Sequence, residues 1–521
     1  MAKMRLFLSF VASLCVFIVL LPFSLADEGT IVEAGVLIDD AFIYAVIAEN
    51  IASGLGATFD GIHQTNGYQP LWMLLIVIAK TIAPSLEIIS VQIWLSVALY
   101  SAGYGLLVWW FVEELSLPKL LGLGFLLSFS VLNSSFFRPI FLGLETPLLF
   151  SLIPIWLIYA RQLVARKDNA SHIFALAITS CGIFLTRTDM FWVVPVTALV
   201  VLYLHRASFR TACFFLPCLS IVLTYLLYNL HYFGSLIPIS GRVKKFYMNL
   251  QYPTWESYWA SDQWQGLFSM TDKVWNMSFY VTLLFLAATF MPLLSRKFRA
   301  FFPKEFIVFS IIILLHLLYL QFIHREVRPY TSYYFLPEII FILVSVSFLF
   351  QRFAGIFFER MGFIKAVNLR YTGAILATTA IAWAFLQPSY KLKPSESWRD
   401  RLAVAQAASA LLQPNDLAGA FWPGLIAYTM PQTVVPLDGI AASPQYFESF
   451  VKTGSELERA DELGVNYLIV EIPDNFSILQ PIDSVPRWSQ IYLSRLSNSE
   501  DFHFEEVHTE GNWKLLRMNK K

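Results

Sequence analysis

The chain has 521 residues, of which 57% are hydrophobic and 14% are charged. Soluble domains carry roughly 25% charged residues, and several apolar runs here reach the length that crosses a bilayer, so the composition excludes an ordinary soluble protein. The formal net charge is zero, which gives no basis for a nucleic-acid partner. All four cysteines lie in apolar runs, so neither a disulfide framework nor a thiolate metal site is expected. We expect a polytopic membrane protein.

The first apolar run, residues 6–25, follows a short basic amino terminus and fits two interpretations. It ends in Ser24-Leu-Ala26, small residues of the kind that precede a signal-peptide cleavage site. The run is longer than the apolar core of about 7 to 15 residues that is usual in a signal sequence, which favours a retained helix. In either case the chain that follows emerges on the non-cytoplasmic side.

Basic residues set the topology of the rest. Clusters near 161–167, 206–210, 296–304 and 352–370 are cytoplasmic by the positive-inside rule. Counting back through a span at about 144–160 puts Glu145 outside, beside the loop that carries Asp39. Three apolar runs lie between these two residues, and an odd number of crossings cannot return to the same side, so the shortest run, 70–83, is assigned to the interface. The spans are then expected at 6–25, 88–112, 120–137, 144–160, 172–186, 190–204, 211–231, 276–295, 305–323, 333–351 and 371–387.

The prediction is therefore an all-α polytopic domain over residues 1–387, with about eleven transmembrane helices in the plasma (inner) membrane. After residue 388 the composition is that of a soluble domain. Residues 399–412 and 456–463 are expected to form helices, and Val465–Glu471 a buried strand, which indicates a small α/β domain over 388–521 on the outer face. The aromatic residues of the outer segment 232–273 suit either an interfacial helix or a platform for a sugar.

Acidic residues gather at the outer boundary. Asp39, Asp40, Glu145 and Asp189 each fall within a few residues of a predicted helix end. A carboxylate that loses water there costs free energy unless it is compensated, so such groups are candidates for a functional site. Each has a structural alternative: a helix cap for the paired Asp, a dipole partner for Glu145 and an ion pair with Arg187 for Asp189. Their occurrence together on one side favours function.

Basic residues on the same side break the positive-inside bias. Arg242, Lys244 and Lys245 follow one predicted span, and Arg325 and Arg328 lie at the next outer boundary. Arg and Lys at headgroup depth suit a membrane-embedded phosphate, although ordinary anionic lipid is an alternative ligand. Acidic and basic groups on one face suggest a reaction in which a hydroxyl loses a proton while a phosphate leaves.

The sequence also constrains the sugar donor. It has no Walker loop and no glycine-rich strand-to-helix turn that would hold a nucleotide. A sugar carried on a lipid phosphate, which reaches the outer face through the bilayer, fits better. One Asp would act as general base on the acceptor hydroxyl, which gives inversion by direct displacement, and the cationic residues would stabilise the phosphate.

These residues belong to a series of motifs that runs in order from Asp39 to Tyr334. The series consists of Asp39-Asp-Ala-Phe-Ile43, Phe59-Asp-Gly-Ile-His-Gln-Thr-Asn-Gly-Tyr-Gln-Pro-Leu-Trp72, Gly143-Leu-Glu-Thr-Pro147, Thr186-Arg-Thr-Asp189, Phe233-Gly-Ser-Leu-Ile-Pro-Ile-Ser240 with Lys244, and Arg328-Pro-Tyr330 with Tyr333-Tyr334. It resembles the GT-C superfamily of polyprenyl-phosphate-dependent glycosyltransferases. Within that superfamily it is most similar to the bacterial arabinofuranosyltransferase-like branch.

The resemblance implies an inverting hexosyl- or pentosyltransferase that moves a sugar from a polyprenyl-phosphate donor to a hydroxyl of a cell-envelope glycan, lipid or protein. By this resemblance Asp39 matches the catalytic base, with Asp40 beside it and Glu145 as the second acidic residue. The residues expected to bind substrate are Asn66, Tyr68, Arg187, Asp189, Arg242, Lys244, Lys245, Arg325, Arg328 and Tyr333. Relatives in this branch often carry two Arg on the helix after the paired Asp, whereas Val46 and Glu49 stand here, so the identity of the sugar is not carried over.

Some members of the superfamily bind a divalent cation. Asp39, Asp40 and His63 are the candidate ligands here, and oxygen ligands suit Mg²⁺, Mn²⁺ or Ca²⁺. Lys and Arg can supply the positive charge instead, in which case no cofactor is required.

Two other classes of function compete with a transferase. A transporter or flippase of lipid-linked saccharides needs polar groups along a path across the bilayer, and His316 is the main polar exception in the predicted spans. A histidine in such a place is more often hydrogen-bonded structure than a relay. An intramembrane protease is disfavoured because neither His-Glu-x-x-His nor Gly-x-Ser-x-Gly occurs.

Overall fold

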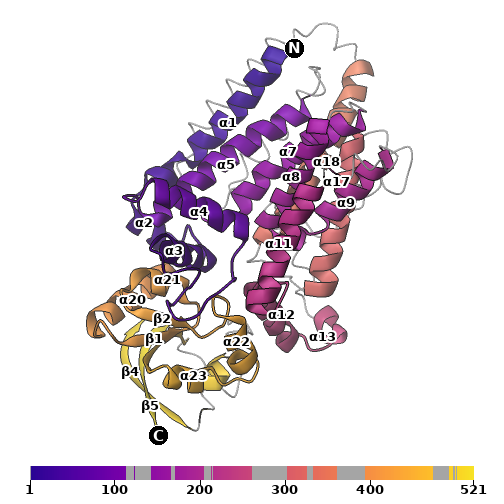
Figure 1. Ribbon diagram of the computed structural model, residues 1–521. Helices are drawn as coiled ribbons and strands as arrows, with labels where there is room; N and C mark the ends of the chain where they lie inside the picture. The colour runs from indigo at the N-terminus through magenta and orange to yellow at the C-terminus, as the bar shows by residue number, and fades with distance from the viewer. Residues whose placement is uncertain are drawn as a thin grey trace.

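A computed structural model describes residues 2–112, 123, 142–165, 170–204, 213, 215–260, 302–324, 332–360, 394–472, 492–496, 499 and 501–521. These residues form a helical bundle followed by a small domain built on a mixed sheet (Figure 1). The two chain ends lie at opposite ends of the molecule, the amino end at the tip of the bundle and the carboxyl end in the sheet (Figure 1).

The bundle is built from helices of unequal length. They are α1 (Ala2–Leu25), α2 (Glu28–Glu33), α3 (Asp39–Ala52), α4 (Pro70–Ile82), α5 (Ile88–Phe111), α7 (Thr146–Val164), α8 (Ala170–Thr186), η2 (Thr188–Met190), α9 (Val193–Leu204), α11 (Leu216–Phe233), α12 (Ile239–Gln251), α13 (Trp255–Ala260), α17 (Lys304–Leu318), η4 (Tyr319–His324), η5 (Ser332–Phe335) and α18 (Leu336–Arg360).

Five of the described helical stretches are long and apolar enough to cross a membrane: Lys3–Leu25, Ile88–Phe111, Thr146–Val164, Leu216–Phe233 and Tyr333–Phe357. The predicted spans at 172–186 and 190–204 correspond to shorter apolar helices, as does the run from Pro70 that was assigned to the interface. The predicted spans at 276–295 and 371–387, and 120–137 apart from Leu123, lie outside the described residues. The described chain therefore supports a mostly helical protein with several apolar helices, and not the count of eleven.

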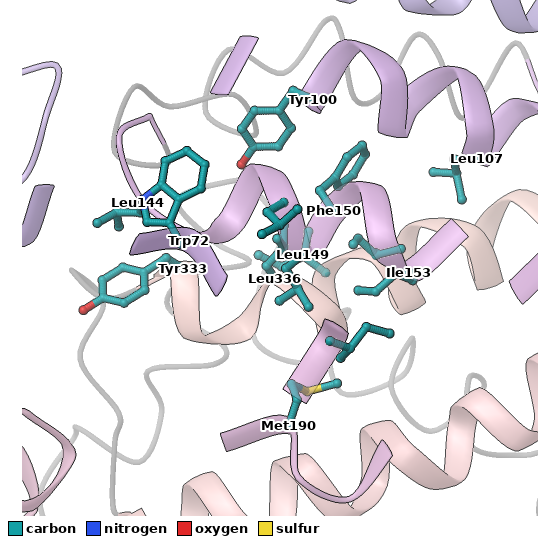
Figure 2. Packing of buried hydrophobic residues seen from close by; sticks show 14 of the residues in the cluster. Trp72, Tyr100, Leu107, Leu144, Leu149, Phe150, Ile153, Met190, Tyr333 and Leu336 are labelled. Atoms are coloured by element: carbon teal, nitrogen blue, oxygen red, sulfur yellow. The ribbon is translucent and has the colours of Figure 1, made fainter. Parts of the chain in front are cut away.

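Small residues let the central helices pack closely. A Cβ added to Gly103 of α5 would lie 2.9 Å from the Cα of Ser151 in α7, and one on Gly105 would lie 2.9 Å from the main-chain oxygen of Ser9 in α1. Figure 2 shows the core that results, in which Trp72, Phe150 and other large apolar side chains gather around the first half of α7. Trp72 is fully buried, and its indole Nε1 donates to the carbonyl oxygen of Gly143 at 3.1 Å. This contact fixes α4 against the turn that carries Glu145.

The second domain contains α20 (Glu396–Leu411), β1 (Leu417–Ala420), α21 (Pro423–Thr429), β2 (Thr433–Pro436), α22 (Pro444–Tyr446), η7 (Phe447–Val451), α23 (Glu456–Glu462), β3 (Val465–Glu471), β4 (Phe502–Glu510) and β5 (Trp513–Lys520). The strand order is β2-β1-β3-β5-β4, with β2, β1 and β3 parallel and β5 antiparallel to both β3 and β4. The two expected helices and the strand Val465–Glu471 are confirmed, within a few residues at the helix ends. The boundary predicted at 388 lies outside the described residues.

Helix α3 lies where the bundle meets the second domain. In Figure 1 it sits beside α21, with the sheet beyond. Phe42 of α3 contacts the rings of Trp398 in α20 and Tyr428 in α21, with centroid distances of 6.0 and 5.5 Å. The helix that carries the paired Asp therefore has two neighbours, the bundle on one side and the second domain on the other.

Candidate active site

Asp39 and Asp40 point in different directions. Neighbouring residues on an α-helix are about 100° apart, whereas residues three or four positions apart share a face. Asp40, Ile43 and Tyr44 accordingly line one cavity, while Asp39 makes its contacts with the second domain. The pair thus serves two surfaces.

The residues that line this cavity surround a partly open hollow whose empty space, adjoining solvent included, is about 440 Å³. Its wall comes from both domains and from distant parts of the chain. The lining residues are Asp40, Ile43, Tyr44, Gly67, Gln69, Leu144, Glu145, Arg187, Ser240, Lys244, Tyr333, Tyr334 and Ile440.

One wall of the cavity is an ion pair supported by two phenols. Lys244 Nζ lies 2.9 Å from Asp40 Oδ2, and the two side chains are 20% and 23% exposed. The Tyr333 hydroxyl donates to the same carboxylate oxygen at 3.1 Å, and Lys244 donates to the hydroxyls of Tyr333 and Tyr334 at 3.2 and 3.3 Å. Partial exposure leaves both charged groups accessible to a ligand.

A second carboxylate in the cavity wall, Glu145, is held more tightly. Arg187 Nη1 lies 2.8 Å from Glu145 Oε1, and the Tyr44 hydroxyl donates to Glu145 Oε2 at 3.2 Å. Burial raises the pKa of the Tyr44 phenol well above its ordinary value, and the Glu145 charge adds to this shift, so Tyr44 stays a proton donor. The phenol oxygen in turn accepts a hydrogen bond from the main-chain amide of Gln69 at 2.9 Å. Glu145 is therefore oriented by two partners from other segments, and Gln69 fixes one of them, Tyr44.

Arg187 is a buried residue that lines the cavity. Its Nε donates to Asp189 Oδ1 at 3.0 Å, its Nη2 pairs with Asp189 Oδ2, and its guanidinium stacks 4.4 Å from the ring centre of Tyr334. Three of its nitrogens already bind carboxylates, so Arg187 organises the acidic residues and the tyrosines. It is also fully buried at 2% exposure.

A buried polar network extends from Asp189, the partner of Arg187. His316 Nδ1 lies 2.6 Å from Glu338 Oε1, and His316 Nε2 lies 3.7 Å from Asp189 Oδ2. His316 was expected to be a hydrogen-bonded structural residue, and these contacts agree with that. Glu338 was not identified from the sequence, although a carboxylate in an apolar helix is a signal that could have been read.

Asp39 lies away from the cavity. Its side chain is 7% exposed and pairs with the buried Arg401 of α20. Its Oδ2 accepts from the amide of Gly424 at 3.1 Å, and its Oδ1 accepts from the amide of Leu425 at 3.0 Å. The catalytic role predicted for Asp39 stays untested, but its carboxylate faces the second domain and is occupied by these donors.

Several other predicted substrate-binding residues support the site without lining it. Asn66 is buried, donates to Asn229 at 3.1 Å and accepts from the Ile239 amide at 3.0 Å, so it anchors the start of α12. Arg242 pairs with Glu448 of the second domain. Tyr68 is half-buried, and burial raises its pKa to about 12. Lys245 is exposed on α12.

Of the remaining predictions, Tyr333 lines the cavity, Asp189 holds Arg187, and Arg325 and Arg328 lie outside the described residues.

The predicted metal ligands do not form a cluster. His63 Nδ1 pairs with Asp60 Oδ2 at 2.7 Å, and Asp39 faces Arg401. Within the described part of the chain, no group of three or more His, Cys, Asp or Glu residues could hold a metal ion. Coordination by Asp39, Asp40 and His63 stays untested, although adjacent helical positions carry the two carboxylates to different faces.

The sequence analysis missed several lining residues. Tyr44 lies four positions after Asp40 on a helix, and this spacing could have identified it. Gln69 and Ser240 lie inside quoted motifs, and Tyr334 follows Tyr333. Ile440 comes from the second domain, and no sequence signal points to it.

No protein-family model matches the chain, and no curated protein matches it in sequence. It is similar to the Archaeoglobus fulgidus oligosaccharyltransferase in complex with Zn and sulfate, at 14% identity and a TM-score of 0.42, over 83% of this chain and 64% of that one. It is also similar to the archaeal oligosaccharyltransferase AglB from Archaeoglobus fulgidus in complex with an inhibitory peptide and a dolichol-phosphate, at 14% identity and a TM-score of 0.38, over 83% and 65%. The chain thus spans just under two thirds of the length of these structures. Similarity at this level does not assign an activity.

Proposed function

We propose that the protein is an inverting membrane glycosyltransferase of the GT-C type. It transfers a sugar from a polyprenyl-phosphate donor to a hydroxyl of a glycan, lipid or protein on the non-cytoplasmic side of the membrane. One observation carries the proposal: Asp40, Glu145, Arg187, Lys244 and the tyrosine pair, from distant segments, line a single cavity. The sequence predicts these groups at one face of the membrane, and a transferase needs them within reach of one sugar.

In the proposed reaction Asp40 is the general base. Its carboxylate takes the proton from the acceptor hydroxyl as that oxygen forms a bond to the anomeric carbon of the donor. The bond from that carbon to the phosphate oxygen breaks on the opposite side, so the configuration inverts and polyprenyl phosphate leaves. Asp40 suits this role better than Asp39 because its side chain is partly exposed in the cavity and Asp39 is held by the second domain.

Lys244 stabilises the departing phosphate. Its ammonium group lies 2.9 Å from Asp40, so each charge compensates the other before substrate binds. The bound donor is a phosphodiester with one negative charge, and the departing phosphate monoester gains a second, so Lys244 is attracted towards the phosphate increasingly as the bond breaks and leaves Asp40 free to accept a proton. Positive charge aimed at a developing phosphate charge is a large contribution to catalysis.

Glu145 and the two tyrosines position the sugar. Glu145 is fixed by Arg187 and Tyr44, and its carboxylate can accept hydrogen bonds from sugar hydroxyls. Tyr333 and Tyr334 stack with ring centres 4.6 Å apart and lie at the cavity wall. Aromatic rings with polar edges suit the mixed apolar and polar faces of a sugar ring.

The proposal requires no metal ion, because Lys244 and Tyr333 already supply a cation and a hydrogen-bond donor beside Asp40. Purified protein should transfer a labelled sugar from a synthetic polyprenyl-phosphate donor and retain this activity in excess EDTA. Loss of activity in EDTA, restored by Mg²⁺ or Mn²⁺, would show that a metal is needed. As a control, the variant Glu462→Gln removes one partner of an exposed ion pair with Arg459, far from the proposed base in sequence, and it should transfer sugar as the wild type does.

The competing function is transport of the lipid-linked saccharide. A transporter would move the intact donor across a vesicle membrane without cleaving its phosphate bond. The same protein in vesicles loaded with donor distinguishes the two: release of free polyprenyl phosphate supports the transferase, whereas movement of uncleaved donor supports transport.

A further inference from the structure

We propose that Asp39 is a positioning residue, through which the second domain sets the orientation of Asp40. This inference rests on the proposed function, because it assigns Asp40 the role of base. It concerns the contact of Asp39 with Arg401, Gly424 and Leu425, which we call the α3 latch. The latch joins residues that are 362 or more positions apart in the chain.

The latch satisfies Asp39 as a structural carboxylate. Oδ1 accepts from Arg401 and from the Leu425 amide, and Oδ2 accepts from the Gly424 amide. The Asp39 side chain and that of Arg401 are each 7% exposed. A buried carboxylate with a charged partner and two amide donors is held in one orientation, and it has little freedom to take a proton from a substrate.

Arg401 is itself fixed on the side of the second domain. Its guanidinium lies 5.5 Å from the ring centre of Trp398 and 4.9 Å from that of Trp513. It also donates to the carbonyl oxygen of Trp422. Trp422 has φ 61° and ψ 63°, a left-handed conformation that costs free energy in a residue with a bulky side chain. The turn directs the amides of the next residues at Asp39, so the strained conformation serves the latch.

The approach of the two chains at the latch is too close for a side chain. A Cβ added to Gly424 would collide with the main-chain oxygen of Asp39 and lie 2.6 Å from its Oδ1. Because the obstacle is main chain, it cannot rotate away. Gly424 is therefore needed for the second domain to reach the first residue of α3.

The second domain also holds the partner of Asp40. Tyr247, three residues after Lys244 on α12, donates to the carbonyl oxygen of Asp438 at 3.3 Å. Two residues beyond Asp438, Ile440 lines the cavity itself. The same domain thus contacts the helix of the base and the helix of the cation, so it can fix the geometry between Asp40 and Lys244.

The test compares variants that break the latch with one that removes its charge altogether. Arg401→Gln leaves Asp39 as an unpaired buried charge, and we expect kcat to fall about 10²-fold, as for a small displacement of a catalytic group, with KM for the donor little changed. The double variant Asp39→Asn with Arg401→Gln removes the charge and retains an acceptor, and it should regain about tenfold of the lost kcat. Arg401→Lys keeps the charge without the fork, so its kcat should fall between those of wild type and Arg401→Gln.

A different pattern of kcat values would contradict the proposed role of Asp39. If Asp39 were the base, Asp39→Asn would be as inactive as Asp40→Asn, and the double variant would recover nothing. The control is Arg517→Gln, which alters an exposed arginine on β5 of the same domain and should leave kcat unchanged.

A second readout separates the inference from the proposed function. Amide hydrogen exchange of residues 39–48 should be at least about tenfold faster in Arg401→Gln and in Gly424→Ala than in wild type, because α3 loses its anchor. Unchanged exchange in both variants would overturn the latch. If wild-type protein transfers no sugar, the proposed function and the role given to Asp40 are wrong, while the exchange experiment still decides whether the second domain holds α3.

Discussion

Asp39 and Asp40 are chemically identical, but the two sides of helix α3 give their carboxylates different exposure and different partners. On the side of the second domain, Asp39 is 7% exposed and is bound by an arginine and two amides. On the cavity side, the Asp40 side chain is 23% exposed and its Oδ2 is bound by a lysine and a phenol. A fully satisfied carboxylate stabilises structure, whereas a partly exposed one keeps the capacity to exchange a proton or a partner. The comparison teaches that adjacent acidic residues need not share a role.

The largest effect should come from the cavity side. Asp40→Asn removes the proposed base and should lower kcat by about 10²- to 10⁴-fold, without a change in the unfolding temperature. The measurement is sugar transfer from a synthetic donor, alongside thermal unfolding. Activity near that of wild type in this variant would contradict the assignment of Asp40 as the base.

The cation beside Asp40 comes next. Lys244→Gln removes the charge that we assign to the phosphate and should lower kcat by about 10²- to 10³-fold. The same variant also frees Asp40 from its ion pair, so an increase in activity would show that the lysine restrains the base rather than aiding departure of the phosphate. Lys452→Gln, on an exposed ion pair with Glu448, serves as the control.

A smaller effect is expected where the second domain enters the cavity. Ile440→Ala removes three carbon atoms from the cavity wall and should raise KM for the donor about tenfold, because an apolar contact of this size contributes about 1–3 kcal/mol. It should leave kcat nearly unchanged, since Ile440 carries no reacting group. Comparing pentosyl and hexosyl donors would show whether the wall selects by size: the larger sugar should lose less.

The last prediction concerns the dependence of stability on pH and not activity. Burial raises the pKa of Asp438 to about 7, and the charge of Asp39 adds to the shift, whereas the amide of Ile440 opposes it. The folded protein therefore binds this proton more tightly than the unfolded chain does, and the associated stability is lost as pH rises from about 4 towards 7. The slope contributed by one proton is at most about 1.4 kcal/mol per pH unit. Asp438→Asn should flatten the unfolding free energy over this range. An equally steep dependence in that variant would assign the slope to another group.

Much of the local structure could be read from the sequence. Apolar runs predicted α5, α7, α11 and α18, and the segment Val465–Glu471, predicted as a buried strand, forms a strand with these bounds. Asp40, Glu145, Lys244 and Tyr333, which the sequence analysis expected on one face of the membrane, line one cavity. These features follow from periodicity and from the energetics of charge at a membrane boundary, both of which are properties of short segments.

The roles within the paired Asp could not be predicted in the same way. Whether Asp39 or Asp40 meets the cavity depends on the rotation of α3, and that rotation is fixed by Arg401 and Gly424 from the second domain. The helical repeat shows which residues share a face of α3, but it does not show which neighbouring element each face will contact. Arg242 was assigned to substrate because it breaks the positive-inside bias, and its pairing with Glu448 of the second domain could not be predicted from a short segment.

Two glycines lie on the seam between the domains, and their closeness to main-chain oxygens has an evolutionary consequence. A Cβ on Gly67 would lie 2.6 Å from the carbonyl oxygen of Ile440, just as one on Gly424 would strike that of Asp39. Each glycine belongs to one domain and the oxygen it faces to the other, so neither half can diverge freely at these points. A chimaera that joins the bundle to a foreign carboxyl-terminal domain should fold as two parts yet lose transfer unless both glycines and their opposing loops are inherited together.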